Sequence, residues 1–340
     1  MKKQFYLLIL FLMTTIAASS QGYYTVNNGG GFTANFTDLQ VAVNTVPAGS
    51  VLLIHPSGTT YGNVNINKPL TLVGNGYFLG SNPAPNTQNN LGTSIIDRVF
   101  FFTGSSNSMV TGLYLGGFTI YDTVTNITIT RNYLYAGSSS SRGNHTITQN
   151  FFNYCSIDMS SGTTIFKNNI MYSPNNGFNQ YPFIRNNATA FVEHNIFDYS
   201  RNSNDEAFNT GGTVVYKNNI LLSNSLSKYT IGIGTNITYS NNISTDSTFA
   251  GTLNAKVKIS RDSLFANFIS ASQDGKYQLK ANSPAKNYGD DGDNAGAFTN
   301  SKPYVLSGIP FIPNVFFLDI PTIGTTGTGL PIHIKAKANN

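Results

Sequence analysis

The middle of the chain repeats one pattern of apolar and polar positions. A phrase with an asparagine in every copy occurs six times, at Asn132, Asn150, Asn169, Asn195, Asn219 and Asn242. An apolar residue stands three positions before each asparagine and another directly after it, and the position two before is polar. Such alternation is typical of a β-strand with one buried face. The pattern therefore predicts a short strand on each side of every asparagine, with both apolar positions facing the interior.

The spacing of the asparagines predicts how these strands are arranged. Successive asparagines are 18, 19, 26, 24 and 23 residues apart, which suits one coil of a solenoid. Asparagine tolerates the left-handed backbone conformation that a tight bend needs, so each one is expected to form a corner. If the coils stack as parallel strands about 4.8 Å apart, the six amides would lie above one another as a hydrogen-bonded ladder.

An asparagine corner between two short β runs resembles the right-handed parallel β-helix of the pectate-lyase-like superfamily. The resemblance covers residues 31–298 and includes segments within 262–298 that resemble closing coils. A short helix capped by Asp38 or Thr37, with Leu39, Val41 and Ala42 on one side, precedes the coils. The resemblance implies an all-β, right-handed parallel β-helix solenoid in which this helix caps the first coil.

The ends of the chain predict export and a separate tail. Lys2 and Lys3, an apolar run over residues 5–16 and small residues at 17–20 have the pattern of a secretory signal peptide. We expect residues 1–20 to be the signal peptide, residues 21–300 the β-helix, and residues 301–340 a short C-terminal β cap or tail. The protein is then secreted or held at the cell surface. No later segment has enough consecutive apolar residues to span a bilayer.

Composition fits an all-β chain and limits its partners. Only 10% of residues are charged, glycines number 32 and tryptophan is absent. The net charge is +5, and subtracting the 2 lysines of the signal peptide leaves +3, too little to imply a nucleic-acid partner. Cys155 is the one cysteine, so no internal disulfide can form. We expect a monomer that is held together by its core and its backbone ladders.

Charged residues gather around Asn195 in a chain that has few of them. Parallel stacking would place Lys167, Glu193 and Lys217 on adjacent coils, with opposite charges as neighbours. Ordinary surface pairing of this kind contributes under about 1 kcal/mol and is one interpretation. A functional site is the other, because more charged residues lie nearby in the sequence, namely Arg185, Asp198, Arg201, Asp205 and Glu206.

The superfamily resemblance suggests what such a site would do. Polysaccharide lyases of this fold use Lys or Arg to remove a proton beside a uronic carboxylate, which calcium or a cation neutralises. By this resemblance the candidate bases are Lys167, Lys217, Arg185 and Arg201. Glu193 would bind substrate or calcium, and Asp198, Asp205 and Glu206 would bind calcium through oxygen ligands. The Asn-Thr-Asp and Gly-His-Gly phrases of the galacturonase branch are absent, so hydrolysis by that route is not expected.

A non-catalytic function is the favoured alternative. An exported β-helix can bind a polysaccharide or a cell-surface glycan along its polar face, or serve a purely structural role. Tyr135 and Tyr172 are expected on that face, where aromatic rings stack on sugars. The turn over residues 290–294 offers oxygen ligands for calcium, although a solvated turn is the better interpretation. His145 lies in an apolar column and is expected to be an interior histidine with satisfied hydrogen bonds.

Overall fold

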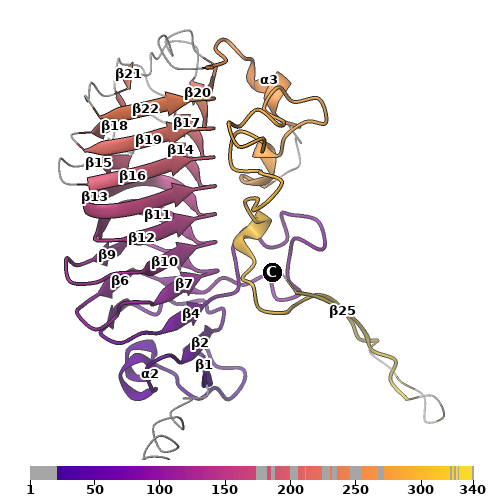
Figure 1. The fold of residues 1–340 in the computed structure, drawn as a ribbon. Coiled ribbons are helices and arrows are strands. Elements are labelled where there is room, and N and C mark those ends of the chain that lie inside the picture. Colours follow the sequence, from indigo (N-terminus) through magenta and orange to yellow (C-terminus); the bar gives the residue numbers. More distant parts are fainter. Residues whose placement is uncertain are drawn as a thin grey trace, which may run out of the picture.

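The strands of the protein stack in parallel as the coils of a β-solenoid (Figure 1). The computed structural model describes residues 21–173, 182–184, 188–199, 206–210, 212–223, 230–231, 236–245, 254–266, 272–321, 324, 327 and 329–338. The predicted all-β solenoid is therefore confirmed. The physical basis is the repeated alternation of apolar and polar residues, which buries one face of each short strand against the other sides of the coil.

The coils align their strands in three parallel sheets. The front sheet comprises β1 (Tyr23–Val26), β2 (Val51–Ile54), β4 (Thr71–Val73), β7 (Met109–Thr111), β10 (Ile127–Thr130), β12 (His145–Thr148), the end of β13 (Phe151–Lys167), β16 (Ala188–Glu193), β19 (Thr213–Lys217) and β22 (Ile237–Ser240). From β10 onward, each of its strands precedes an asparagine corner.

The strands that follow the corners form the side sheet, which comprises β5 (Ile95–Ile96), β8 (Tyr114–Leu115), the starts of β11 (Tyr133–Arg142) and β13, β14 (Ile170–Ser173), β17 (Ile196–Tyr199), β20 (Ile220–Ser223) and β23 (Ile243–Ser244). The rear sheet comprises β3 (Asn63–Ile66), β6 (Arg98–Phe101), β9 (Phe118–Ile120), later parts of β11 and β13, β15 (Pro182–Ile184), β18 (Glu206–Thr210) and β21 (Thr230–Ile231).

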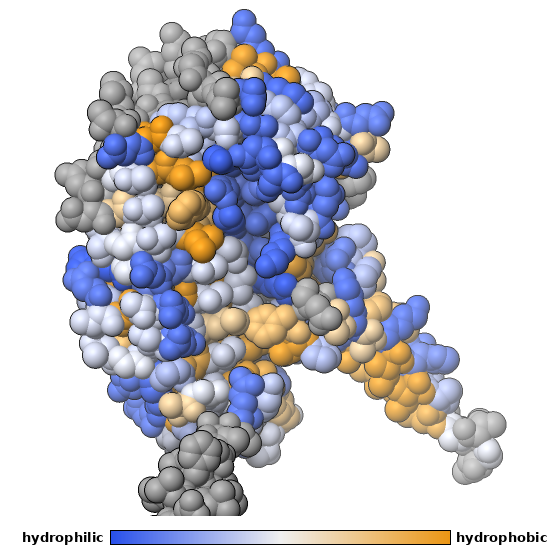
Figure 2. All heavy atoms as spheres, in the orientation of Figure 1, coloured by the Kyte–Doolittle hydropathy of each residue, from blue (hydrophilic) through white to orange (hydrophobic). Residues whose placement is uncertain are grey.

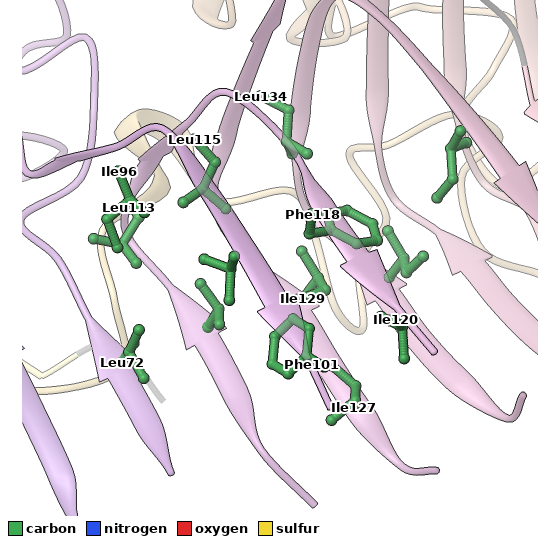
Figure 3. Close-up of a cluster of buried hydrophobic side chains, with 14 of the residues drawn as sticks. Leu72, Ile96, Phe101, Leu113, Leu115, Phe118, Ile120, Ile127, Ile129 and Leu134 are labelled. Atoms are coloured by element: carbon green, nitrogen blue, oxygen red, sulfur yellow. The ribbon is translucent and has the colours of Figure 1, made fainter. Parts of the chain in front are cut away.

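The interior of the coils is filled by stacked apolar side chains. The residues three before each ladder asparagine are buried there, among them Ile129, Phe166 and Val192. Residues two after the corners, such as Leu134, complete the same core. Figure 3 shows Leu134 and Ile129 in this cluster together with side chains from neighbouring coils. Each coil thus buries its apolar face against the coils above and below it.

The residues directly after the asparagines do not face this interior, contrary to the sequence prediction. They belong to a second apolar cluster, on the outer side of the side sheet, and are Tyr133, Phe151, Ile170, Ile196, Ile220 and Ile243. The buried asparagine takes the inward place at the corner, so the next side chain points outward by strand alternation. The partners of these residues come from the C-terminal part of the chain and include Leu264, Tyr277, Ala295 and Tyr304.

Residues 259–266 and 272–309, hereafter the covering segment, lie along the outside of the solenoid. They include α3 (Arg261–Leu264), η1 (Gly275–Tyr277) and η2 (Leu306–Gly308). In Figure 1 the segment runs beside the stack from its last coils back toward its first. It does not add the closing coils expected from the sequence. Instead it shields the outward apolar column of the side sheet from water.

The predicted N-terminal helix is α2 (Leu39–Thr45), which lies beside the first coils (Figure 1). The Asp38 carboxylate accepts a hydrogen bond from the Val41 amide at 2.7 Å and so caps the helix. Leu39, Ala42 and Val43 enter the core, whereas Val41 is 53% exposed and not on the buried side as predicted. Positions 39, 42 and 43 share one face because a helix repeats every 3.6 residues. No helix in the described part of the chain is long and apolar enough to cross a bilayer.

The tail is a two-stranded antiparallel hairpin of β24 (Asn314–Asp319) and β25 (His333–Lys337). It projects from the side of the molecule near the first coils (Figure 1). Of the two forms expected for the C-terminal residues, the structure therefore has the tail and not a cap on the last coil.

Candidate functional site

The six corner asparagines form a continuous buried ladder, and Asn195 illustrates its geometry. Its Nδ2 donates to the backbone oxygen of Phe166 at 2.9 Å and to Oδ1 of Asn219 at 3.0 Å. Its own Oδ1 accepts from the backbone amide of Asn169 at 2.9 Å. The same bonds link Asn132, Asn150, Asn169, Asn195, Asn219 and Asn242. The ladder is fully buried, so its function is to hold the coils together.

The left-handed residue at each corner is the one before the ladder asparagine, not the asparagine itself as predicted. The φ values are 57° for Arg131, 58° for Gln149, 54° for Asn168, 54° for His194, 57° for Asn218 and 51° for Asn241. The ladder amide is fixed by its neighbours above and below, so the preceding residue adopts the bend. Asparagine fills only some of these positions.

The left-handed residues hold the covering segment in place. Each hydrogen-bonds to it, and the partners follow the reverse order of the chain: Arg131 with Ile309, Gln149 with Pro303, Asn168 with Ala297, His194 with Asn294, Asn218 with Asp290 and Asn241 with Tyr288. Sequence reasoning missed this column. The signal was a polar or cationic residue before every ladder asparagine, but no single residue type is common to all six positions.

The charged column predicted from the sequence exists, but its lysines are engaged. Register places Lys167 beside Glu193 and Glu193 beside Lys217. Lys167 forms an ion pair with Glu193, and the Lys217 ammonium lies 2.7 Å from a carboxylate oxygen of Asp290 in the covering segment. The hydrogen bond with Asp290 raises the pKa of Lys217. An amine held in its charged form is poorly suited to abstract a proton.

Of the residues predicted to bind calcium on the loops near Asn195, the structure describes the side-chain surroundings of Asp198. Asp198 is buried and its Oδ2 lies 2.7 Å from the Arg261 guanidinium and 2.6 Å from the Tyr277 hydroxyl, which donates to it. Arg185, Arg201 and Asp205 lie outside the described residues, and Glu206 begins β18 with a side chain that is also outside them. Within the described ranges, no group of three or more His, Cys, Asp or Glu side chains is arranged to hold a metal ion.

The acidic turn at 290–294 uses its carboxylates to fasten the covering segment. Asp290 binds Lys217, and Oδ2 of Asp291 lies 3.0 Å from Nε2 of His194. Asp293 accepts a hydrogen bond from the Ser301 hydroxyl at 2.7 Å. The carboxylates of the turn therefore bind protein groups that organise the closing loop.

Tyr135 and Tyr172 lie on a different side of the corner from the charged column. Both are half-buried on β11 and β14 of the side sheet, whereas Lys167 and Glu193 lie on the front sheet. The Tyr135 ring centroid is 4.5 Å from that of Tyr114, and both rings pack against the second apolar cluster. The tyrosines and Glu193, all expected to bind substrate, do not form one site.

The outer face of the front sheet carries a recess that the sequence did not predict. Its volume is about 370 Å³, and it is lined by Asn126, Thr128, Asn144, His145, Thr146, Thr163 and Ile165. His145 is buried, with Nδ1 accepting from the Ile127 amide at 3.2 Å and Nε2 donating to the Arg142 carbonyl at 2.7 Å. It is thus an interior histidine with both ring nitrogens satisfied, and burial lowers its pKa. The lining is therefore neutral.

An apolar strip extends from the recess along the same outward column. Ile165 is 37% exposed, and Phe191 and Val215 are half-buried on the next two coils in register with it. The face seen in Figure 2 shows apolar side chains among polar ones over this part of the front sheet. The recess and strip together offer amide and hydroxyl groups beside an apolar surface.

Comparison with known proteins does not place the chain in a family. No protein-family model matches it, and no curated protein does. The fold and the geometry of its surfaces therefore carry the functional argument.

Proposed function

We propose that this protein is exported and binds a neutral polysaccharide or cell-surface glycan on the outer face of the front sheet. The observation that carries the proposal is the recess of about 370 Å³, which is lined by amides, hydroxyls, the buried His145 ring and one aliphatic side chain. Amides and hydroxyls exchange hydrogen bonds with sugar hydroxyls, and Ile165 offers an apolar surface to the C–H face of a ring.

The repeat of the solenoid suits a polymer. Coils about 4.8 Å apart present the outward column again and again along one axis, from Thr128 and Thr146 to Ile165, Phe191 and Val215. Solenoids use such repeated surfaces for extended binding sites. A chain of sugar units running along the axis would meet a similar set of groups at successive coils.

Catalysis by β-elimination receives less support. The resemblance to the pectate-lyase-like superfamily suggests a lyase, but Lys167 and Lys217 are ion-paired. A lyase acting on an acidic polymer also needs a cation facing the uronic carboxylate, and the recess lining contains no Lys or Arg. Binding without turnover is the function that the geometry of this face favours.

Affinity electrophoresis of the mature protein tests the proposal. Gels would contain xylan, mannan or β-glucan as neutral polymers, and pectate or alginate as acidic ones. We expect retardation by at least one neutral polymer. Thr146→Phe should fill the recess and weaken binding at least about tenfold. Asn63→Phe is the matched control, because Asn63 is exposed on β3 of the rear sheet and does not line the recess or the apolar strip.

The possible results separate the candidate functions. Failure of every neutral polymer to retard the folded protein would refute neutral-glycan binding, as would equal retardation of the Thr146→Phe and Asn63→Phe variants. Ultraviolet absorbance of unsaturated products, measured with pectate and alginate in the presence and absence of calcium, should stay flat. A calcium-dependent rise would favour a lyase instead.

A further inference from the structure

The C-terminal hairpin is an isolated sheet with two opposite faces of different character. Strands β24 and β25 pair with each other and with no other described strand. A two-stranded hairpin is marginally stable in water, because it has no second layer on which to bury its side chains. Figure 1 shows the hairpin projecting away from the solenoid, so the rest of the described chain does not supply that layer.

Cross-strand register defines the two faces. Leu318 pairs with Ile334, and the neighbouring pairs, Phe317 with Lys335 and Asp319 with His333, point to the opposite side. The Lys335 ammonium lies 5.1 Å from the Phe317 ring centroid, which places these two side chains together. Alternation gives an apolar face made of Leu318, Ile320, Ile332, Ile334 and Ala336, and a polar face made of Phe317, Asp319, His333, Lys335 and Lys337.

The apolar face is open to solvent. Ile320 is 49% exposed, Ile332 is 53% exposed and Ile334 is 59% exposed. Figure 2 shows a continuous apolar surface along the projecting hairpin. Several large aliphatic side chains gathered on one exposed face are typical of an interaction site rather than of ordinary scattered exposure.

We propose that this apolar face packs against the same face of a second copy of the protein, so that two hairpins form a two-layered sheet across a twofold axis. In a twofold contact the same patch of each copy faces the other, so like charges on the patch would be brought together. The apolar face carries no charged side chain, whereas Lys335, Lys337, His333 and Asp319 all lie on the other face. Packing through the apolar face therefore buries isoleucines and leaves the charges in water.

The distribution of residue types favours a protein partner over a lipid surface. Faces that bury into a bilayer interface are rich in Trp, Phe and Leu. Here the aromatic ring of Phe317 lies on the polar face beneath Lys335, and the apolar face has three isoleucines, which are β-branched and pack well in sheets. The sequence-based expectation of a monomer is replaced by this proposal.

Sedimentation velocity of the mature protein, over a range of concentrations and without any glycan, tests the interface independently of glycan binding. We expect a concentration-dependent dimer. Ile334→Asp should weaken it at least about a hundredfold, because the substitution buries an unpaired charge in each copy. Lys335→Asp is the matched control, since it introduces the same residue one position away on the opposite face and should leave the dimer intact. Far-ultraviolet circular dichroism would verify that both variants retain the solenoid.

Three outcomes would overturn the proposal. The wild-type protein stays monomeric at every concentration, or Ile334→Asp dimerises as well as wild type, or Lys335→Asp abolishes the dimer as fully as Ile334→Asp. Flotation with vesicles of phosphatidylcholine and phosphatidylglycerol provides a second measurement. Flotation of a monomeric protein that is lost in Ile334→Asp would assign the face to lipid.

Discussion

Replacement of Asn195 by alanine is the sharpest test of how the solenoid is held together. The Asn195 amide is fully buried and makes bonds in both directions along the stack. Its Nδ2 donates to Phe166 and Asn219, and its Oδ1 accepts from both the backbone amide and Nδ2 of Asn169, at 2.9 and 3.1 Å. Alanine removes the amide at the centre of three successive coils and offers no replacement partner.

The expected cost follows from the groups left without this partner. The Asn169 backbone amide and the Phe166 carbonyl are both buried at the corner and both lose the Asn195 side chain. A buried polar group left unsatisfied costs about 1–3 kcal/mol, so Asn195→Ala should lower the free energy of unfolding by about 2–6 kcal/mol. A typical domain has a total stability of about 5–15 kcal/mol, so this loss should be large.

Equilibrium urea unfolding, followed by far-ultraviolet circular dichroism, measures this loss. Asn63→Ala is the control, because Asn63 is exposed on β3 and its replacement should change stability by less than about 0.5 kcal/mol. Asn195→Asp preserves the shape of the side chain but turns its donor toward Phe166 and Asn219 into an acceptor, so it should destabilise at least as much as alanine. A cost below about 1 kcal/mol for Asn195→Ala would refute the argument that the ladder stabilises the stack.

Two further predictions concern carboxylates in the covering segment. Burial alone would raise the pKa of Asp290, but hydrogen bonds from Lys217 and Asn218 outweigh it and hold the pKa below its usual value. The stability that ionised Asp290 contributes is present above the unfolded pKa of about 3.9 and is lost as pH falls through the lower folded pKa. Lys217→Ala should raise the pKa of Asp290, which a carbon-detected NMR titration would measure. Asp274 is the opposite case, since burial raises its pKa despite hydrogen bonds from Ser272 and Asn82. The free energy of unfolding should therefore fall as pH rises from the unfolded toward the folded pKa of Asp274. If Asp274→Asn showed the same dependence of this free energy on pH as wild type, Asp274 would not be its source.

The sequence by itself determined the repeating part of the molecule. Coil length, the alternation around each corner and the stacking of Asn132 through Asn242 are local and periodic, so they can be read without knowing any distant contact. The adjacency of Lys167, Glu193 and Lys217 followed from the same register. The helix at Leu39–Thr45 was also predictable, because its cap at Asp38 is a local signal.

Only the tertiary structure decided what covers the solenoid and where its chemistry lies. Residues 259–309 have no repeat, and their contacts join positions far apart in the chain, such as His194 with Asp291 at a separation of 97 residues. Those contacts bury the outward-pointing column after each asparagine in a second apolar cluster, and they pair Lys217 and Asp198 with partners that no local pattern indicates. The recess likewise is lined by residues from neighbouring coils, such as Asn126, Thr146 and Thr163. Periodicity specifies how coils stack, whereas a non-repeating segment finds its place through side-chain contacts that exist only once the stack has formed.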